Sequence, residues 1–148
     1  MTEAPVVKLK AQAPLSPALL GGGYSLADPL QLVELVREGV PWSLYHGVAS
    51  DLGLSEQVVA DVLRIPPRTL ARRKGGRLEP HEGERLLRFV RLVARATEVL
   101  GDSKKAARWL EAPNRALGGA TPLSLLDTDI GTQAAEDVLA RIEYGVFS

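Results

Sequence analysis

Residues 54–77 read LSEQVVADVLRIPPRTLARRKGGR, and this stretch decides the fold. Valine and leucine recur in its first half at the spacing of one helix face, and Ser55 can cap that helix at its N-terminus. Pro66 and Pro67 cannot continue the helix, but Pro67 suits the first turn of a new one because a missing N–H costs nothing there. The stretch therefore predicts two short helices joined by a tight turn, the second running from about Pro67 to Lys74 and stopping at two glycines.

The second of these helices is basic on its outward side. Leu70 and Ala71 can face the first helix, whereas arginine suits guanine edges and phosphates, and threonine suits a phosphate or a thymine methyl. Such a helix pair is the helix-turn-helix pattern, whose second helix enters the major groove of DNA. The candidate DNA-binding residues are Arg68, Thr69, Arg72, Arg73, Lys74 and Arg77. The alternative interpretation is an ordinary helical hairpin with a solvated basic face.

The charges of the chain are unevenly distributed, although the formal net charge is zero. Between Arg64 and Arg95 there are ten arginine or lysine residues against three glutamates, whereas the rest of the chain has eight basic and fifteen acidic residues. A basic segment within an acidic chain is expected of a small module that binds nucleic acid.

The composition limits the class of protein. With 148 residues, 45% of them hydrophobic, the chain can form one compact domain or two small helical units with a shared core. The absence of cysteine excludes disulfides and thiolate metal sites. No apolar run approaches the ~20 residues of a membrane span, and the N-terminus lacks the pattern of a signal peptide. We therefore expect a soluble, cytoplasmic protein with no membrane partner.

Helix signals recur along the rest of the chain and predict an all-α fold, with a helix-turn-helix core and additional C-terminal helices. Asp28, Pro29 and Gln31 offer an N-cap, an N1 proline and a capping box for a first helix. Its broad apolar face is expected to hold Leu30, Leu32, Val33, Leu35 and Val36. Further helices are expected at Trp42–Leu52, His81–Leu100, Lys104–Glu111 and Leu123–Leu126, and from about Thr132 to Tyr144.

Three regions follow from these signals. Prolines and three consecutive glycines indicate a flexible N-terminal arm over residues 1–27. Residues 28–100 form the helix-turn-helix region, and residues 101–148 form a C-terminal region. Along the long helix before residue 100, arginines recur every three or four residues, at Arg85, Arg88, Arg91 and Arg95. They extend the DNA footprint, form salt bridges with acidic helices or are simply solvated.

No set of residues typical of catalysis is found. His46 and His81 are the only histidines, and neither stands in the spacing of a metal site. The carboxylates between Asp127 and Asp137 have no base, nucleophile or ligand set beside them in the sequence. We therefore expect neither an enzyme nor a bound cofactor or metal ion. Phe147, next to last and beyond a glycine, either forms an exposed apolar tip suited to another protein's pocket or folds back onto the core.

From Leu54 to the C-terminus, about two thirds of the chain, the sequence resembles the Xre/MbcA/ParS family of antitoxins, the partners of RES-domain toxins. The resemblance lies in RTL and RR of the second helix (68–70 and 72–73), AARWL (106–110), PN (113–114), LGG (117–119), TPL (121–123), LDT (126–128), Gly131 and RIEYGV (141–146).

This resemblance implies a dimeric antitoxin of a type II toxin-antitoxin system. Its helix-turn-helix would bind operator DNA and repress its own operon, and its C-terminal region would cover the active site of an NAD-degrading RES-domain toxin, in a higher hetero-oligomer. The toxin-binding residues would be Arg141, Glu143, Tyr144, Val146 and Phe147. The alternative is a stand-alone dimeric transcription regulator, whose C-terminal helices only dimerise. In either case the helix-turn-helix can also be retained only as a scaffold.

Overall fold

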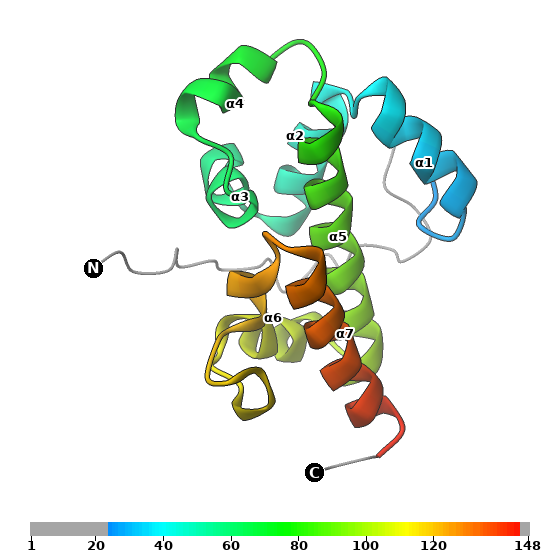
Figure 1. Ribbon diagram of the computed structural model, residues 1–148, viewed down its shortest axis with the longest axis vertical. Helices are drawn as coiled ribbons and strands as arrows, with labels where there is room; N and C mark the ends of the chain where they lie inside the picture. Colours follow the sequence, from blue (N-terminus) through cyan, green and yellow to red (C-terminus); the bar gives the residue numbers. More distant parts are fainter. Residues whose placement is uncertain (1–23, 146–148) are drawn as a thin grey trace.

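The computed structural model describes residues 24–145, which form helices joined by short turns (Figure 1). The α-helices are α1 (Pro29–Glu38), α2 (Trp42–Leu52), α3 (Glu56–Leu63), α4 (Pro67–Arg73), α5 (Pro80–Leu100), α6 (Ser103–Glu111) and α7 (Asp129–Glu143). Two 3-10 helices, η1 (Arg115–Leu117) and η2 (Pro122–Leu125), precede α7. The predicted all-α fold is confirmed over the described residues. The expected N-terminal arm as far as residue 23, and also Val146 and Phe147, lie outside them.

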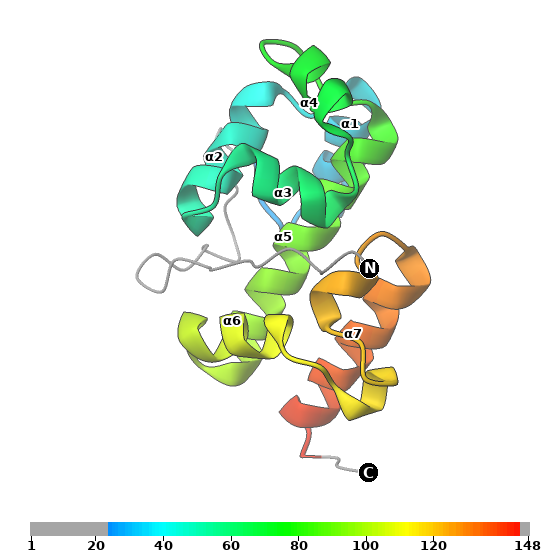
Figure 2. The same cartoon turned by 90° about the vertical axis from the view of Figure 1, so that its left-hand side faces the viewer.

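Helix α5 is the spine of the molecule and contacts both halves of the chain. Helices α1 to α4 gather around its N-terminal half, and α6 and α7 pack on its C-terminal half (Figures 1 and 2). Its buried side chains therefore lie on more than one face, including Leu86, Phe89, Leu92 and Ala96. One hydrophobic cluster continues through both halves, so α5 connects the helix-turn-helix to the C-terminal helices without a flexible linker.

Helix α1 begins as predicted, with the Asp28 carboxylate accepting the backbone N–H of Gln31 at 3.2 Å. The predicted capping box is wrong, because the Gln31 side-chain oxygen accepts the N–H of Ser25 instead, at 3.0 Å. The predicted apolar face is also wrong at Leu30 and Val33, whose side chains are 78% and 43% exposed. Apolar residues occur on both sides of α1, and only the side that faces the core is buried, at Leu32 and Leu35.

Helix α2 has the predicted bounds. The Trp42 side chain is half-buried and stacks on Tyr45, with ring centroids 4.8 Å apart. The buried Tyr45 hydroxyl donates to the backbone oxygen of Glu56 at 2.7 Å. Burial raises the pKa of Tyr45, and the nearby Glu56 carboxylate adds to this effect. This bond ties α2 to the start of α3.

In the C-terminal half, side-chain caps start each element. Asp102 accepts the N–H of Lys105 at 2.7 Å at the start of α6, and Thr121 accepts the N–H of Ser124 at 3.2 Å at the start of η2. Helix α7 begins at Asp129, earlier than the predicted Thr132. Glycine is a common helix stop, but Gly131 lies inside the first turn here.

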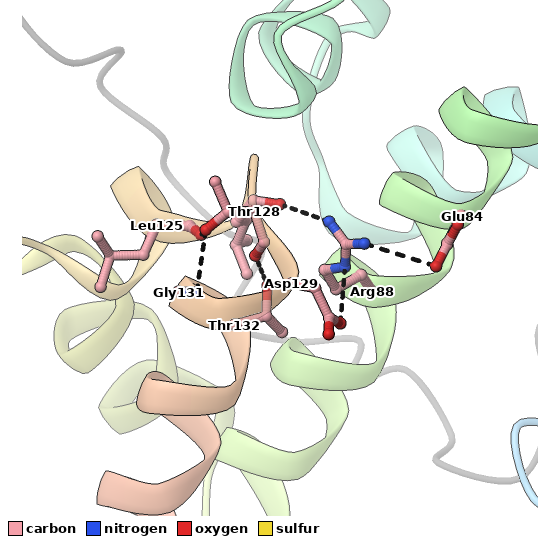
Figure 3. Close-up of polar contacts among 8 residues, drawn as sticks. Glu84, Arg88, Leu125, Thr128, Asp129, Gly131 and Thr132 are labelled. Carbon is pink, nitrogen blue, oxygen red and sulfur yellow. Dashed lines mark hydrogen bonds and ion pairs between the residues drawn. The ribbon is translucent and has the colours of Figure 1, made fainter.

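The joint between α5 and the start of α7 depends on Thr128 and Arg88 (Figure 3). The Thr128 hydroxyl accepts the N–H of Gly131 at 2.9 Å and so caps α7. The Arg88 guanidinium donates to the backbone oxygen of Leu126 at 3.3 Å and lies 4.0 Å from the Asp129 carboxylate. Arg88 therefore holds the turn before α7 against α5. No helix in the described part of the chain is long and apolar enough to cross a membrane.

Candidate functional site

Helices α3 and α4 form the predicted helix-turn-helix. Ser55 caps α3 by accepting the N–H of Val58 at 3.1 Å. At the other end, Arg64 has φ 61°, in the left-handed region, and the N–H of Ile65 reaches back to the oxygen of Ala60 at 2.8 Å. The buried Ile65 anchors the turn in the core, since its side chain is 3% exposed. The chain is thereby redirected within three residues into α4, which Pro67 opens.

One side of α4 is fixed in the core and the other is exposed. Leu70 is buried, as predicted, but the prediction that Ala71 also faces α3 is wrong because Ala71 is exposed. Arg68, Arg72 and Lys74 are exposed. No ion pair joins these three side chains to an acidic residue within the described range 24–145. They form an exposed basic surface, and Thr69 lies half-buried at its edge, where its hydroxyl accepts a hydrogen bond from Arg72 at 3.5 Å.

Arg73 differs from its neighbours because it is paired with a buried carboxylate. Its Nε donates to Glu82 Oε1 at 2.7 Å and its Nη2 donates to Glu82 Oε2 at 3.3 Å. The Glu82 side chain is only 3% exposed, and it also accepts the N–H of Glu79 at 2.7 Å. Burial alone would raise the pKa of Glu82, but the hydrogen bonds from Arg73 and from the Glu79 amide outweigh it and lower that pKa. The pair fixes the end of α4 to the start of α5.

Arg77 is also occupied within the fold. Its Nη1 donates to the backbone oxygen of Gly39 at 2.8 Å, and its backbone forms an isolated antiparallel bridge with Pro41. The loop after α4 is held further by the N–H of Leu78, which donates to the oxygen of Val40 at 2.8 Å. The sequence pattern grouped all six candidate DNA-binding residues together. The structure leaves Arg68, Arg72 and Lys74 exposed and without an ion pair, although Arg72 donates a long hydrogen bond of 3.5 Å to the Thr69 hydroxyl on the same helix. It binds Arg73 and Arg77 to other parts of the chain.

The second group of candidate residues lies at the end of α7, far from α4 along the spine (Figure 2). Arg141 is exposed in the last turn, and Tyr144, directly after the helix, is 75% exposed. The carboxylate of Glu143 is bound by both terminal nitrogens of Arg95, at 2.8 and 2.9 Å. Val146 and Phe147 follow this turn in the sequence, but they lie outside the described residues.

The arginines of α5 share one structural role, except for Arg91, which is exposed. Arg85 donates to the oxygen of Leu63 at 3.3 Å, Arg88 binds the turn before α7, and Arg95 binds Glu143. Of the three interpretations of this series, salt bridges with an acidic helix describe Arg95 and, at 4.0 Å from Asp129, Arg88. Arg85 fits none of the three, because it binds a backbone oxygen, and Arg91 is exposed. Within residues 24–145 no group of three or more histidine or acidic residues is arranged to hold a metal ion.

The fold and the exposed basic face of α4 define a helix-turn-helix protein of the DNA-binding class, extended by a second helical region. Residues 31–91 match the family model of the antitoxin Xre-like helix-turn-helix domain, and residues 95–145 match that of the antitoxin Xre/MbcA/ParS C-terminal toxin-binding domain. The chain belongs to the Xre/MbcA/ParS family of antitoxins.

Relatives in several bacteria agree with this assignment. An antitoxin Xre of Photorhabdus laumondii is 30% identical over 85% of this chain and 87% of its own length. An antitoxin Xre of Yersinia enterocolitica is 43% identical over 60% of this chain, and the match spans 64% of that protein, slightly less than two thirds. A Prs ADP-ribosylating antitoxin of a Sphingobium species is 26% identical over the full length of both chains. Antitoxins are regulatory binding proteins, so this chain is not an enzyme.

Proposed function

We propose that the protein neutralises a toxin with its C-terminal region, residues 101–148, and represses its own operon in the cytoplasm through the helix-turn-helix region, residues 28–100. The observation that carries the proposal is the separation of two exposed surfaces along α5. The exposed basic face of α4 lies at one end, and the exposed turn after α7 lies at the other (Figure 2). One molecule can therefore hold DNA and a toxin at the same time.

The proposed partner at the C-terminal end is an NAD-degrading RES-domain toxin. Helix α7 is mostly acidic on its polar side, with Asp129, Glu136, Asp137 and Glu143 against Arg141. An acidic surface suits a cleft built for an anionic dinucleotide, because the cleft itself must be basic. The name of the Sphingobium relative refers to ADP-ribosylation, a reaction that also breaks the bond between nicotinamide and ribose in NAD. ADP-ribosylation and NAD degradation both act on NAD, so both reactions require a cleft that binds this anionic dinucleotide.

The proposed contacts with the toxin are Arg141 and Tyr144 in the described turn, and Val146 and Phe147 beyond it. Tyr144 supports this assignment, because its aromatic side chain is 75% exposed directly after α7, and exposed aromatic residues often anchor a protein interface. Glu143 belongs to the same turn, although its carboxylate is already bound by Arg95.

The proposed contacts with operator DNA are Arg68, Thr69, Arg72 and Lys74, with Arg73 and Arg77 holding α4 in place beside them. A helix of seven residues reads only a few base pairs, so we expect a homodimer that binds two half-sites. Together with the toxin, this dimer would form a larger hetero-oligomer.

The toxin part of the proposal is tested by deleting residues 144–148, which leaves the Arg95–Glu143 pair in place. The product of the neighbouring toxin gene is mixed with NAD and with either the full or the shortened antitoxin. We expect the full chain to stop the consumption of NAD and the shortened chain to fail, while both bind operator DNA equally. If the shortened chain still neutralises the toxin, the C-terminal assignment is wrong. If neither chain binds any toxin, the alternative of a stand-alone regulator holds.

The DNA part is tested with Arg68→Gln and Arg72→Gln, measured against operator and unrelated DNA at two salt concentrations. Loss of a base contact should cost about 1–3 kcal/mol at one base pair, and loss of a phosphate contact should lower the salt slope by about 1 for all sequences. Arg37→Gln is the matched control, because Arg37 is exposed on α1 and also lies in the last turn of its helix. If the two α4 variants bind the operator like the control, the helix-turn-helix is only a scaffold.

A further inference from the structure

The end of α7 is held by one ion pair with two-point geometry. Arg95 Nη1 lies 2.9 Å from Glu143 Oε2, and Nη2 lies 2.8 Å from Oε1. These two parallel hydrogen bonds fix the orientation of the guanidinium group relative to the carboxylate. The two side chains are 33% and 30% exposed, and the residues are 48 positions apart in the sequence. Hydrogen bonding to Arg95 lowers the pKa of Glu143, and the same bonds raise the pKa of Arg95.

The position of Glu143 is unfavourable unless Arg95 is present. Glu143 is the last residue of α7, where the helix dipole is negative and disfavours a carboxylate. Arg95 projects from α5, which is anchored in the core over most of its length. The ion pair therefore holds the C-terminal end of α7 against the anchored helix α5, and without it this end would fray.

The chain turns immediately after this pair. The N–H of Tyr144 donates to the oxygen of Ala140 at 3.0 Å, and the N–H of Gly145 donates to the oxygen of Ile142 at 3.2 Å. Gly145 has φ 70°, a left-handed conformation that ends the helix. The Tyr144 side chain is exposed and is not part of the hydrophobic core that the described residues form. The direction of the backbone after α7 is therefore set by Glu143 and by the backbone hydrogen bonds of Tyr144 and Gly145.

We infer that Arg95 and Glu143 form a positioning pair, which holds Tyr144 and Gly145 in the orientation that meets the toxin without either partner contacting the toxin's catalytic groups. This inference rests on the proposed function and adds a residue of α5 to it. Without the pair, the last turn must be ordered during binding, and that entropy cost weakens the complex. The pair acts on affinity through preorganisation.

A matched control is available on the same helix. Arg91 lies one turn before Arg95 and lines the same open groove between α5 and α7, a space of about 410 Å³. Arg91 is exposed and has no ion pair within the described part of the chain. Arg91→Gln therefore removes the same charge from the same surface but leaves the last turn of α7 held.

The experiment is a double-mutant cycle on the full-length antitoxin, with the dissociation constant measured against the toxin encoded beside it. The variants are Arg95→Gln, Glu143→Gln, both together, and the exchanged pair Arg95→Glu with Glu143→Arg. We expect each single variant to weaken binding about tenfold and the double variant to be no weaker than either. The exchanged pair should recover part of the loss, because a carboxylate at position 95 would also face Glu98, which lies 3.6 Å from Arg95 in the wild type. Arg91→Gln should bind like the wild type, and all variants should keep operator affinity and thermal stability.

Three results would overturn the inference. Single variants that bind like the wild type would show that the pair does not affect the toxin complex. Additive losses, or an exchanged pair that recovers nothing, would show that the two side chains act separately, as they would if Glu143 touched the toxin directly. The deletion of residues 144–148 separates these outcomes from failure of the proposed function. If that deletion leaves neutralisation intact, the C-terminal end is not the toxin-binding element, whatever the pair does.

Discussion

The buried Arg73–Glu82 pair gives the sharpest quantitative prediction. Glu82 accepts three hydrogen bonds, two from Arg73 and one from the N–H of Glu79, and its side chain is 3% exposed. Substitution of Glu82 by Gln keeps the shape but removes the charge and leaves at least one donor without its acceptor. A buried donor without a partner costs about 1–3 kcal/mol, and breaking a fully buried ion pair costs about 3–5 kcal/mol.

The geometry places the expected loss of stability within the lower of these two ranges. The Arg73 side chain is 17% exposed, so water can partly solvate its guanidinium after the substitution. We therefore expect Glu82→Gln to lower the free energy of unfolding by about 2 kcal/mol, which for a chain of this size lowers the melting temperature by about 4–8 °C. Helix α4 would also be less firmly held, so operator affinity should fall although Glu82 is far too buried to touch DNA.

The contribution of Glu82 to the free energy of unfolding depends on pH, and the sign of this dependence follows from its lowered pKa. The pKa of Glu82 is lowered in the folded state, so its contribution to stability is complete above the pKa of the unfolded chain, about 4.3 for glutamate. That contribution is lost as the pH falls through the lowered pKa. Urea unfolding followed by circular dichroism should therefore show a gap between wild type and Glu82→Gln at pH 7 that closes below about pH 4.

Glu84→Gln is the matched control, because Glu84 lies on the same turn of α5 but its side chain is 63% exposed. Its ion pair with Arg88 is long, at 3.6 Å, and solvent-exposed on the Glu84 side. It should change stability by less than about 0.5 kcal/mol. The reasoning is refuted if Glu82→Gln is as stable as Glu84→Gln at pH 7, or if the gap between Glu82→Gln and wild type persists unchanged at pH 3.

Two further predictions concern joints between helices. Gly131→Ala should destabilise the protein by about 1–3 kcal/mol in urea unfolding, because the new Cβ would lie 2.8 Å from both Leu125 Cβ and Thr128 Oγ1. If the variant is as stable as the wild type, the backbone at the start of α7 can shift to make room for the methyl group. Tyr45→Phe should cost about 1 kcal/mol, since it removes the hydroxyl that donates to Glu56, whereas an unchanged melting temperature would show that this bond adds nothing.

Local signals in the sequence were sufficient for most of the helices. Asp28 and Ser55 cap the helices for which they were predicted, because a capping bond joins residues only three positions apart. The start of α7 was predicted too late, since a glycine within a first turn looks the same in sequence as a glycine that ends a helix. The exposed Leu30 shows the same difficulty, because helical periodicity cannot tell which of two apolar sides will find a partner.

The functional residues could be grouped from the sequence but not ranked. Arg68 and Arg73 look equivalent on the second helix, yet Arg73 is bound to a carboxylate nine positions away on the next helix. Burial of Glu82 has no local signal, because it depends on a partner that only the fold supplies. The Arg95–Glu143 pair spans 48 positions, so its two members appeared as one of several helix arginines and one of several candidate toxin contacts.

The central claim is that two separate surfaces serve two partners, and amide hydrogen exchange followed by mass spectrometry tests it most directly. The full-length protein is measured alone, with operator DNA and with the toxin encoded beside it. The account predicts that DNA slows exchange in peptides covering residues 66–77, and that the toxin slows exchange in peptides covering residues 141–148. Protection of α4 by the toxin, or no protection of the C-terminal peptide in its complex, would contradict it.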